Sequence, residues 1–344
     1  MKRRYKLLGV VAAISTLALA VSAMVLRHES ACGPPPALAG GAGAMKAIVA
    51  RCYGAPDVLR LESVAKPVVA DGQVLVRVHA ASANPLDWHM MRGKPYIMRL
   101  SSGIGLPKDA RVGVDFAGTV EAVAKDVVGF KAGDAVFGAA DGTFSDYVVV
   151  NEKRALALKP ENISFEQAAS VAVAASTALQ ALRDKGQLQP GQKVLVNGAS
   201  GGVGTFVVQI AKSMGAEVTG VCSTRNLDLV RSIGADHVID YTQQDFTRGE
   251  VRYDLIVDMV GNHGVLDIRD ALTATGTLVL VGGQDEGDYL GPLWGFLRAK
   301  AVAPFVSQRI QPMLASVNAA DLQVLRELLQ SGKLVPVIDR HYPP

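Results

Sequence analysis

The chain has 344 residues, of which 49% are hydrophobic and 19% charged, a balance that suits a buried globular protein and excludes a disordered chain. This length predicts about two domains. The formal net charge is only +3, and the four basic residues Lys2, Arg3, Arg4 and Lys6 lie at the extreme N-terminus. The rest of the chain carries no basic stripe, so no nucleic-acid partner is expected.

The N-terminal residues predict a membrane helix. Residues 7–26 are 20 residues without a charge, which as a helix would span about 30 Å, the thickness of the hydrocarbon core of a bilayer. Basic residues precede this segment, and only Arg27 follows it closely, so the N-terminus is expected on the cytoplasmic side. We therefore expect the chain to be held at a membrane by this single helix, if it is translated and left uncleaved.

Two alternatives remain open for the N-terminus. Ala18-Leu19-Ala20 offers a small-residue cleavage pattern, and a cleaved signal peptide would give an exported protein. Residues 30–44 form an uncharged spacer, and Met45 opens a strand pattern as a native start would, which would give a cytoplasmic protein. In each case residues 1–44 are expected to lie outside the fold.

Three cysteines, Cys32, Cys52 and Cys222, are widely spaced and form no C-x-x-C pair. This spacing predicts neither a disulfide framework nor a cysteine-rich zinc site. The thiols are expected to play no part in the function.

From Met45 to about Glu161, short β-rich runs alternate with glycine-bearing turns, a pattern typical of a compact all-β barrel. The runs are residues 46–53, 73–82, 115–124, 134–140 and 144–150. Ser164 and Gln167 then form a capping box, which predicts a helix to about Lys185.

From Lys193 onward the pattern changes to strands that alternate with helices, which predicts parallel βαβ units and a doubly wound sheet. Strands are expected at residues 193–197, 217–222, 237–241, 254–260 and 277–283, with helices at 203–214 and 227–233. The fold class is therefore α/β.

A glycine-rich turn, residues 196–204 with the sequence VNGASGGVG, joins the first of these strands to the first helix. Such a turn lets the backbone approach a pyrophosphate, whose charge is bound by the free N–H groups at the start of the helix. The turn therefore predicts a dinucleotide site formed by Gly198, Ser200, Gly201, Gly202, Val203 and Gly204.

The end of the second strand predicts which dinucleotide is bound. An NAD enzyme usually places an acid there for the ribose 2′-hydroxyl. Residues 220–227 contain no acid and instead offer Ser223, Thr224 and Arg225, which suit a 2′-phosphate. NADP is therefore favoured as the cofactor. The alternatives are that NAD is bound, or that Arg225 is only a solvated surface charge.

Several motifs, GASGGVG, CSTRN, GADHVIDY, ASANPLDWHMMRG and GVDFAGTVE, resemble the zinc-independent quinone oxidoreductase branch of the medium-chain dehydrogenase/reductase family. The resemblance implies a GroES-like β-barrel domain over residues 45–170 and a Rossmann NADP-binding domain over 171–320, with the active site between them. Residues 321–344 would return to the barrel, whose closing part is expected to be missing because family members continue further.

The resemblance also implies a reaction without metal. The positions that match the zinc ligands of metal-dependent relatives are Asn84, Val114 and Val173, none of which can replace a thiolate or an imidazole. Without a Lewis acid, alcohol oxidation is not expected. Transfer of a hydride from NADPH to a quinone or an α,β-unsaturated carbonyl is expected instead.

The family pattern places Asn84, Asp87 and Tyr96 as catalytic candidates at the cleft. It adds Thr177, Tyr241, Gly261 and Gly282 to the cofactor site. An enoyl-thioester reductase and a non-catalytic NADPH-binding sensor or scaffold remain as alternatives, and the sequence is also compatible with a homodimer.

Overall fold

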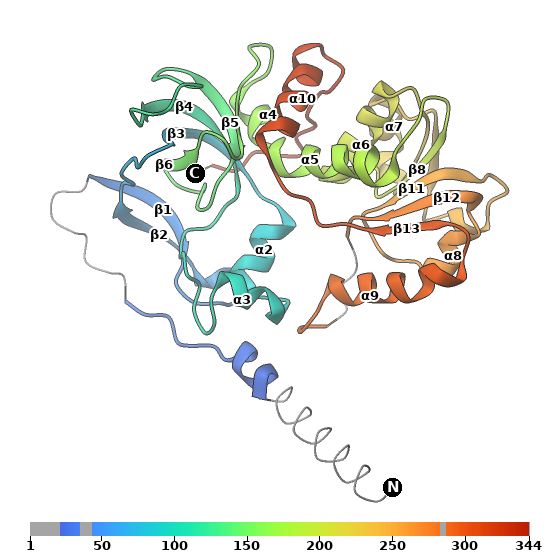
Figure 1. Ribbon diagram of the computed structural model, residues 1–344, viewed down its shortest axis with the longest axis horizontal. Helices are drawn as coiled ribbons and strands as arrows, with labels where there is room; N and C mark the ends of the chain where they lie inside the picture. Colours follow the sequence, from blue (N-terminus) through green and yellow to red (C-terminus); the bar gives the residue numbers. More distant parts are fainter. Residues whose placement is uncertain (1–20, 35–42, 283–286, 344) are drawn as a thin grey trace, which may run out of the picture.

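The computed structural model describes residues 21–34, 43–282 and 287–343. The chain forms two halves that lie side by side, one built on antiparallel sheets and the other on a parallel sheet (Figure 1). The predicted α/β fold class, a GroES-like barrel with a Rossmann sheet, is confirmed by this architecture.

The barrel half contains a five-stranded antiparallel sheet with the order β6-β3-β4-β5-β7 and a two-stranded sheet β1-β2. Alternate residues of the strands fill its core, as shown by Val74, Val76, Phe116 and Val136, each fully buried. The strands are β1 (Ala44–Ala50), β2 (Leu59–Ala65), β3 (Gln73–Ser82), β4 (Asp115–Val123), β5 (Ala135–Ala139), β6 (Tyr147–Asn151) and β7 (Leu156–Leu158). The sequence did not predict β2 or β7, because β2 is largely exposed and β7 has only three residues.

Short helices lie between β1 and β2, between β3 and β4, and after β7. They are η1 (Pro56–Val58), α2 (Pro85–Arg92), η2 (Tyr96–Met98), α3 (Arg99–Ser102), α4 (Phe165–Ala169), α5 (Ala172–Gln180) and the π-helical turn η3 (Ala181–Gly186). The Ser164 capping box is present: the Ser164 hydroxyl accepts from the Gln167 amide, and the Gln167 side chain accepts from the Ser164 amide. The helix predicted to run from there to about Lys185 is interrupted at Ser170.

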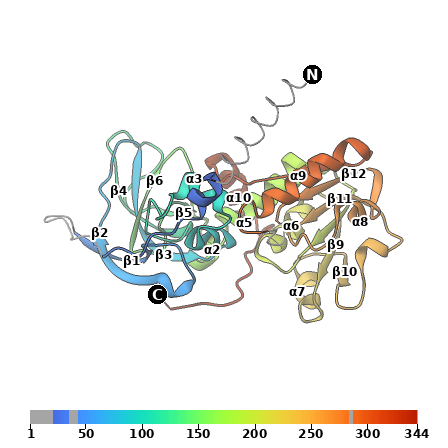
Figure 2. The same ribbon diagram turned by 90° about the horizontal axis from the view of Figure 1, so that it is seen from below.

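The second half is a six-stranded parallel sheet with the order β10-β9-β8-β11-β12-β13, a doubly wound arrangement. Its two faces are covered by different helices, because neighbouring residues of one strand point to opposite sides: Val194 and Val196 pack toward α5, α6 and α10, while Leu195 packs toward α8 and α9. Figure 2 shows this half from below, with α9 to one side of the sheet. The elements are β8 (Lys193–Asn197), α6 (Gly202–Ser213), β9 (Glu217–Cys222), η4 (Thr224–Asn226), α7 (Leu227–Ser232), β10 (His237–Asp240), η5 (Phe246–Arg248), β11 (Tyr253–Asp258), α8 (Val265–Arg269), β12 (Leu272–Leu280), α9 (Pro292–Val302), η6 (Ala303–Phe305), β13 (Arg309–Pro312) and α10 (Ala319–Gln330).

The chain after β13 returns toward the barrel half and joins the two halves (Figure 1). Asn162 donates a side-chain hydrogen bond to the carbonyl of Leu329 in α10 over 2.9 Å. Gln209 of α6 holds the backbone of Val335 through two hydrogen bonds of 2.8 and 3.0 Å. These contacts fix the relative position of the two halves.

The expectation of a membrane helix over residues 7–26 is corrected by the structure. Within residues 21–34, 43–282 and 287–343 no helix has the length and apolar character needed to cross a membrane. Residues 21–27, at the end of the expected span, are helical, whereas residues 7–20 lie outside the described part. The predicted membrane localisation is therefore not upheld.

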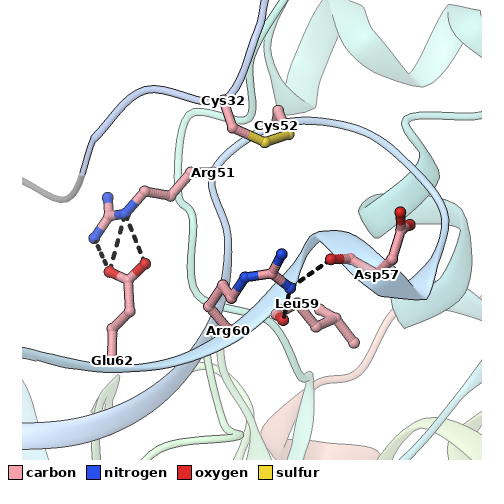
Figure 3. The surroundings of a disulfide bond; sticks show 7 residues. All are labelled: Cys32, Arg51, Cys52, Asp57, Leu59, Arg60 and Glu62. Carbon is pink, nitrogen blue, oxygen red and sulfur yellow. Dashed lines mark hydrogen bonds and ion pairs between the residues drawn. A yellow bond between two sulfur atoms is a disulfide. The ribbon is translucent and has the colours of Figure 1, made fainter.

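Residues 1–44 had been expected to lie outside the fold, but residues 29–32 contact the barrel half. Arg99 of α3 is fully buried and pairs with Glu29 over 2.8 Å, and the Ser30 amide donates to the carbonyl of Gly105 over 3.1 Å. Cys32 and Cys52, with Cα atoms 4.8 Å apart, form a disulfide (Figure 3). The prediction that the cysteines form no disulfide was wrong for these two, because it rested on sequence spacing, which does not show that this segment folds back onto the barrel.

Candidate active site

The turn from β3 into α2 positions two of the catalytic candidates. Asn84 is the N-cap residue of α2, Pro85 occupies the first turn, and the Asn84 amide donates to Asp87 Oδ2 over 2.6 Å. A carboxylate in the first turn of a helix satisfies a backbone N–H that would otherwise lack a partner. Asp87 is thereby held in a buried position at the start of α2.

The other carboxylate oxygen of Asp87, Oδ1, is buried and has no hydrogen-bond partner among the described residues. Burial disfavours the charged form and raises the pKa of Asp87 to about 6. An acidic group with a pKa near neutrality and a free oxygen can exchange a proton with a bound molecule.

Asp115, at the start of β4, is a residue of this site that the sequence interpretation missed. It is fully buried, and it accepts hydrogen bonds from Asn84 Nδ2 over 3.2 Å and from the Val173 amide over 3.1 Å. Its burial, with the nearby Asp87 charge adding to the effect, raises its pKa to about 7. The only sequence signal for it was an acid within the otherwise apolar run GVDFAG.

Asp115 connects the three positions that the family resemblance matches to the zinc ligands of metal-dependent relatives. It bonds Asn84 and Val173 directly and follows Val114 in the chain. An amide and two aliphatic side chains do not fit a zinc ion, which prefers thiolate, imidazole or carboxylate ligands. Among the residues that the structure describes, no three His, Cys, Asp or Glu side chains are grouped as a metal site.

A cavity of about 320 Å³ lies beside this cluster. Asp87 and Val114 line it together with Met90 and Met91 of α2, and the charged side chain of Arg111 also borders it. The volume is at the lower end of that of small-molecule sites, and methionine side chains adapt readily to different ligands. The cavity can therefore receive a compact organic molecule beside Asp87.

Tyr96, the third catalytic candidate, lies apart from Asn84 and Asp87 at the contact between the two halves. Its amide donates to the carbonyl of Asp288 over 2.7 Å, and its ring meets the Tyr289 ring edge-on at 5.2 Å. On its other side the Arg99 guanidinium lies 4.6 Å from the ring centroid. Its hydroxyl donates no hydrogen bond within the described residues, so the structure brings Asn84 and Asp87 together but leaves Tyr96 at the boundary between the halves.

The glycine-rich turn between β8 and α6 has a geometry that would let a ligand approach its backbone closely. Gly198 has a φ of 90°, a conformation that side chains disfavour. A Cβ atom on Gly204 would lie 2.1 Å from the Gly198 carbonyl oxygen, so only glycine fits there. Gly201 caps α6, whose first residues are Gly202 and Val203, and the Ser200 hydroxyl accepts from Asn226.

At the end of β9, the three polar residues predicted to bind a 2′-phosphate differ in what they already contact. The Thr224 hydroxyl donates to Asp240 of β10, whereas Arg225 is exposed and has no ion pair or hydrogen bond with any described residue. Ser223 accepts a hydrogen bond of 3.3 Å from Asn226. Asp240 is a second residue that the sequence interpretation missed, because it comes from the neighbouring strand.

The carboxyl ends of β8 and β11 meet in a polar network. Asp258 Oδ1 accepts from Asn197 over 2.8 Å and from the amides of Val260 and Gly261 over 3.0 Å each, while its buried Oδ2 has no partner among the described residues. Ligands of doubly wound sheets bind at these strand ends. This network therefore shapes the edge at which the cofactor is expected.

The remaining predicted cofactor residues come from α5 and from the segments that follow β10, β11 and β12. Thr177 of α5 is buried and donates its hydroxyl to the Val173 carbonyl over 2.7 Å. Gly261 has a φ of 67°, and a Cβ atom on Gly282 would lie 2.7 Å from the Met259 carbonyl oxygen. Tyr241 is 60% exposed directly after β10.

Comparisons with known proteins agree with this architecture. The family description "Alcohol dehydrogenase GroES-like domain" matches residues 70–161, and "Zinc-binding dehydrogenase" matches residues 233–343. The 2-methylene-furan-3-one reductase of Solanum lycopersicum is 35% identical over 87% of this chain and 72% of its own length.

Two further oxidoreductases are similar to this chain over most of its length. The chloroplastic NADPH-dependent alkenal/one oxidoreductase of Arabidopsis thaliana is 34% identical over 77% of this chain and 72% of its own length. The structure of the quinone oxidoreductase from Coxiella burnetii superimposes with a TM-score of 0.74 and 30% identity, covering 86% of this chain and 91% of that one. The chain belongs to the medium-chain dehydrogenase/reductase family and is similar to its quinone and alkenal oxidoreductases.

Proposed function

We propose that this protein is an NADPH-dependent oxidoreductase that transfers a hydride to a quinone or an α,β-unsaturated carbonyl without a metal ion. The observation that carries the proposal is the cluster around Asp115, where the positions that hold zinc in metal-dependent relatives are Asn84, Val114 and Val173. The reductase names of the relatives support the same class of reaction.

In this proposal the parallel half binds the cofactor. The N–H groups at the start of α6 would hold the pyrophosphate, and Gly198 and Gly204 keep this turn free of side chains. Arg225, which has no partner among the described residues, pairs with the 2′-phosphate, assisted by Ser223. Thr177, Tyr241, Gly261 and Gly282 line the rest of the cofactor site, with Thr177 toward the nicotinamide.

The barrel half binds and polarises the acceptor. NADPH, when bound, would supply the hydride, and the acceptor oxygen would then need groups that stabilise negative charge. Asn84 and Asp87 stabilise that charge by hydrogen bonding, and Asp87 in its acid form donates a proton toward the reduced acceptor. Tyr96 borders the acceptor from the boundary between the halves, where its hydroxyl is available.

Two other functions remain as alternatives. An enoyl-thioester reductase would use the same residues on a different acceptor, and a non-catalytic NADPH-binding sensor or scaffold would keep the cofactor site alone. A homodimer, which the sequence allows, stays a prediction that sedimentation would test.

Stopped-flow oxidation of bound NADPH by a panel of quinones, enones and enoyl thioesters tests the proposal. A quinone or an enone is expected to accelerate the loss of NADPH absorbance. Acceleration only by enoyl thioesters would favour the first alternative. Tight NADPH binding without acceleration by any acceptor would favour the second.

A further inference from the structure

Asp115 is a buried acid whose hydrogen-bond partners are all donors. Its carboxylate accepts from three donors: Asn84 Nδ2 at 3.2 Å, the Ser82 hydroxyl at 3.4 Å, and the Val173 amide at 3.1 and 3.2 Å from its two oxygens. It is 0% exposed. All three neighbours donate hydrogen bonds to this side chain, so the position favours a side chain that only accepts hydrogen bonds.

No cation accompanies this buried carboxylate, since none of the ion pairs in the described part of the chain includes Asp115. The charged group that acts on it is another acid, Asp87, which raises its pKa further. Burying a carboxylate without a cation is costly and raises the pKa of Asp115 to about 7. In its ionised form Asp115 accepts from all three donors, whereas a neutral amide in its place would bring its own NH₂ group against these donors.

We propose that Asp115 is a positioning residue that fixes the side-chain amide of Asn84 for the reaction. This inference rests on the proposed function, and it adds a residue on which the geometry of that site depends. Asp115 itself does not touch the acceptor in this proposal and acts only through Asn84.

The physical reason lies in the shape of an asparagine side chain. The oxygen and the NH₂ group of the amide have nearly the same size, so only their hydrogen-bond partners decide which of them faces which way. Asp115 accepts and cannot donate when ionised, so it holds Nδ2 of Asn84 on its own side. The amide thereby presents one fixed arrangement of donor and acceptor to a bound molecule.

Asp87 contacts Asn84 in a different way from Asp115. It accepts from the main-chain amide of Asn84 over 2.6 Å and so fixes the backbone at the start of α2, and it also acts on the Asn84 side chain. Asp115 accepts directly from Nδ2 over 3.2 Å. The orientation of the Asn84 amide group is therefore the feature that Asp115 holds in this proposal.

A double-mutant cycle tests the proposal. Asp115→Asn keeps the shape but brings an NH₂ group against donors, so the Asn84 amide can turn over. We expect kcat/KM for the acceptor to fall roughly tenfold, the equivalent of one hydrogen bond to a charged group, while the Kd of NADPH stays unchanged. In the Asn84→Ala background the same substitution should have little further effect, because the residue through which it acts is gone.

Asp321→Asn is the matched control. Asp321 is also a buried acid, 3% exposed, but it is held by Arg183, Gln180 and Asn318 far from β4 in sequence. This substitution should lower the melting temperature without lowering kcat/KM. Equal losses of kcat/KM from Asp115→Asn with and without Asn84 would overturn the proposal, because Asp115 would then act on the fold.

A measurement on the wild type decides the matter if Asp115→Asn does not fold. In NMR spectra of the full chain, one of the two Asn84 side-chain amide protons should exchange slowly with solvent, because it is held by a carboxylate that is 0% exposed. Two protons that exchange as fast as those of an exposed asparagine would refute the proposal. A wild type that binds NADPH but reduces no acceptor would refute the proposed function and leave this NMR result standing.

Discussion

The hydroxyl of Thr224 donates a hydrogen bond of 2.5 Å to the carboxylate of Asp240, which joins the end of β9 to the end of β10. This contact occupies Thr224 and leaves Arg225 beside it, exposed and without a partner among the described residues. The selectivity for the 2′-phosphate should therefore depend mainly on Arg225.

Replacing Arg225 by Ala should weaken NADPH binding roughly 10- to 150-fold, since a charge-assisted contact contributes about 1.5 to 3 kcal/mol. NADH lacks the phosphate, so its Kd should barely change. Fluorescence titration of both cofactors measures this. Equal losses for the two cofactors would assign Arg225 to the fold or to the shared pyrophosphate, and a wild type that prefers NADH would contradict the assignment to NADP.

Replacing Gly204 by Ala should disrupt the turn between β8 and α6. The new Cβ atom would lie 2.1 Å from the Gly198 carbonyl oxygen, so the backbone must move, at a cost of roughly 1 to 3 kcal/mol. Both the melting temperature and NADPH affinity should fall. Gly295→Ala in α9 is the control, because no atom lies within 4 Å of its added Cβ, and it should leave NADPH affinity intact. Unchanged NADPH binding in Gly204→Ala would argue against a cofactor site at this turn.

The two buried acids should make the protein less stable as the pH rises toward neutrality. Burial raises the pKa of Asp87 from 3.8 to about 6 and that of Asp115 from 3.8 to about 7. A folded-state pKa above the unfolded one favours the folded state most below the unfolded pKa, and this contribution is lost as the pH rises through the folded pKa. The free energy of unfolding should therefore decline between pH 4 and about 7 through these groups.

Urea unfolding of wild type and Asp87→Asn across this pH range measures the effect. The variant should show a smaller decline, because one of the two groups no longer titrates. Asp236 and Asp321 have lowered pKa values in the folded state, so their charged forms stabilise the fold above the unfolded pKa. This stabilisation is lost only as the pH falls through the lowered pKa, which is more acidic than this pH range. A variant that follows the wild-type curve would show that Asp87 is not the group responsible.

The disulfide between Cys32 and Cys52 should stabilise the barrel half. It closes a loop with a sequence separation of 20, for which the chain-entropy estimate is about 3 kcal/mol. A reductant should therefore lower the melting temperature of the wild type. Cys32→Ser should already have the lower value and should not respond to the reductant. Equal responses of both proteins would show that the reductant acts elsewhere.

The purified protein should contain well under one zinc ion per chain, and chelators should leave its activity unchanged, because Asn84, Val114 and Val173 supply no metal ligand. Elemental analysis and assays with a chelator test this. Stoichiometric zinc would contradict the metal-free mechanism.

Local patterns in the sequence predicted those parts of the fold that depend on neighbouring residues. The strands at Gln73–Ser82, Lys193–Asn197 and Glu217–Cys222 have the predicted bounds, because apolar runs between turn residues encode them directly. The position of the glycine-rich turn between β8 and α6 was predicted for the same reason, since consecutive residues form it. The exposed strand Leu59–Ala65 gave no such pattern and was not predicted.

The tertiary structure alone decided what distant residues do together. Asp115 contacts Asn84 and Val173, which lie 31 and 58 positions away, and Asp240 reaches Thr224 across neighbouring strands. The Cys32–Cys52 pairing and the burial of Arg99 against Glu29 likewise required the N-terminal segment to fold back onto the barrel. Periodicity and motif spacing report which face or turn a residue occupies, whereas burial, pKa and hydrogen-bond partners depend on which elements pack against it, and packing is settled only when the whole chain is folded.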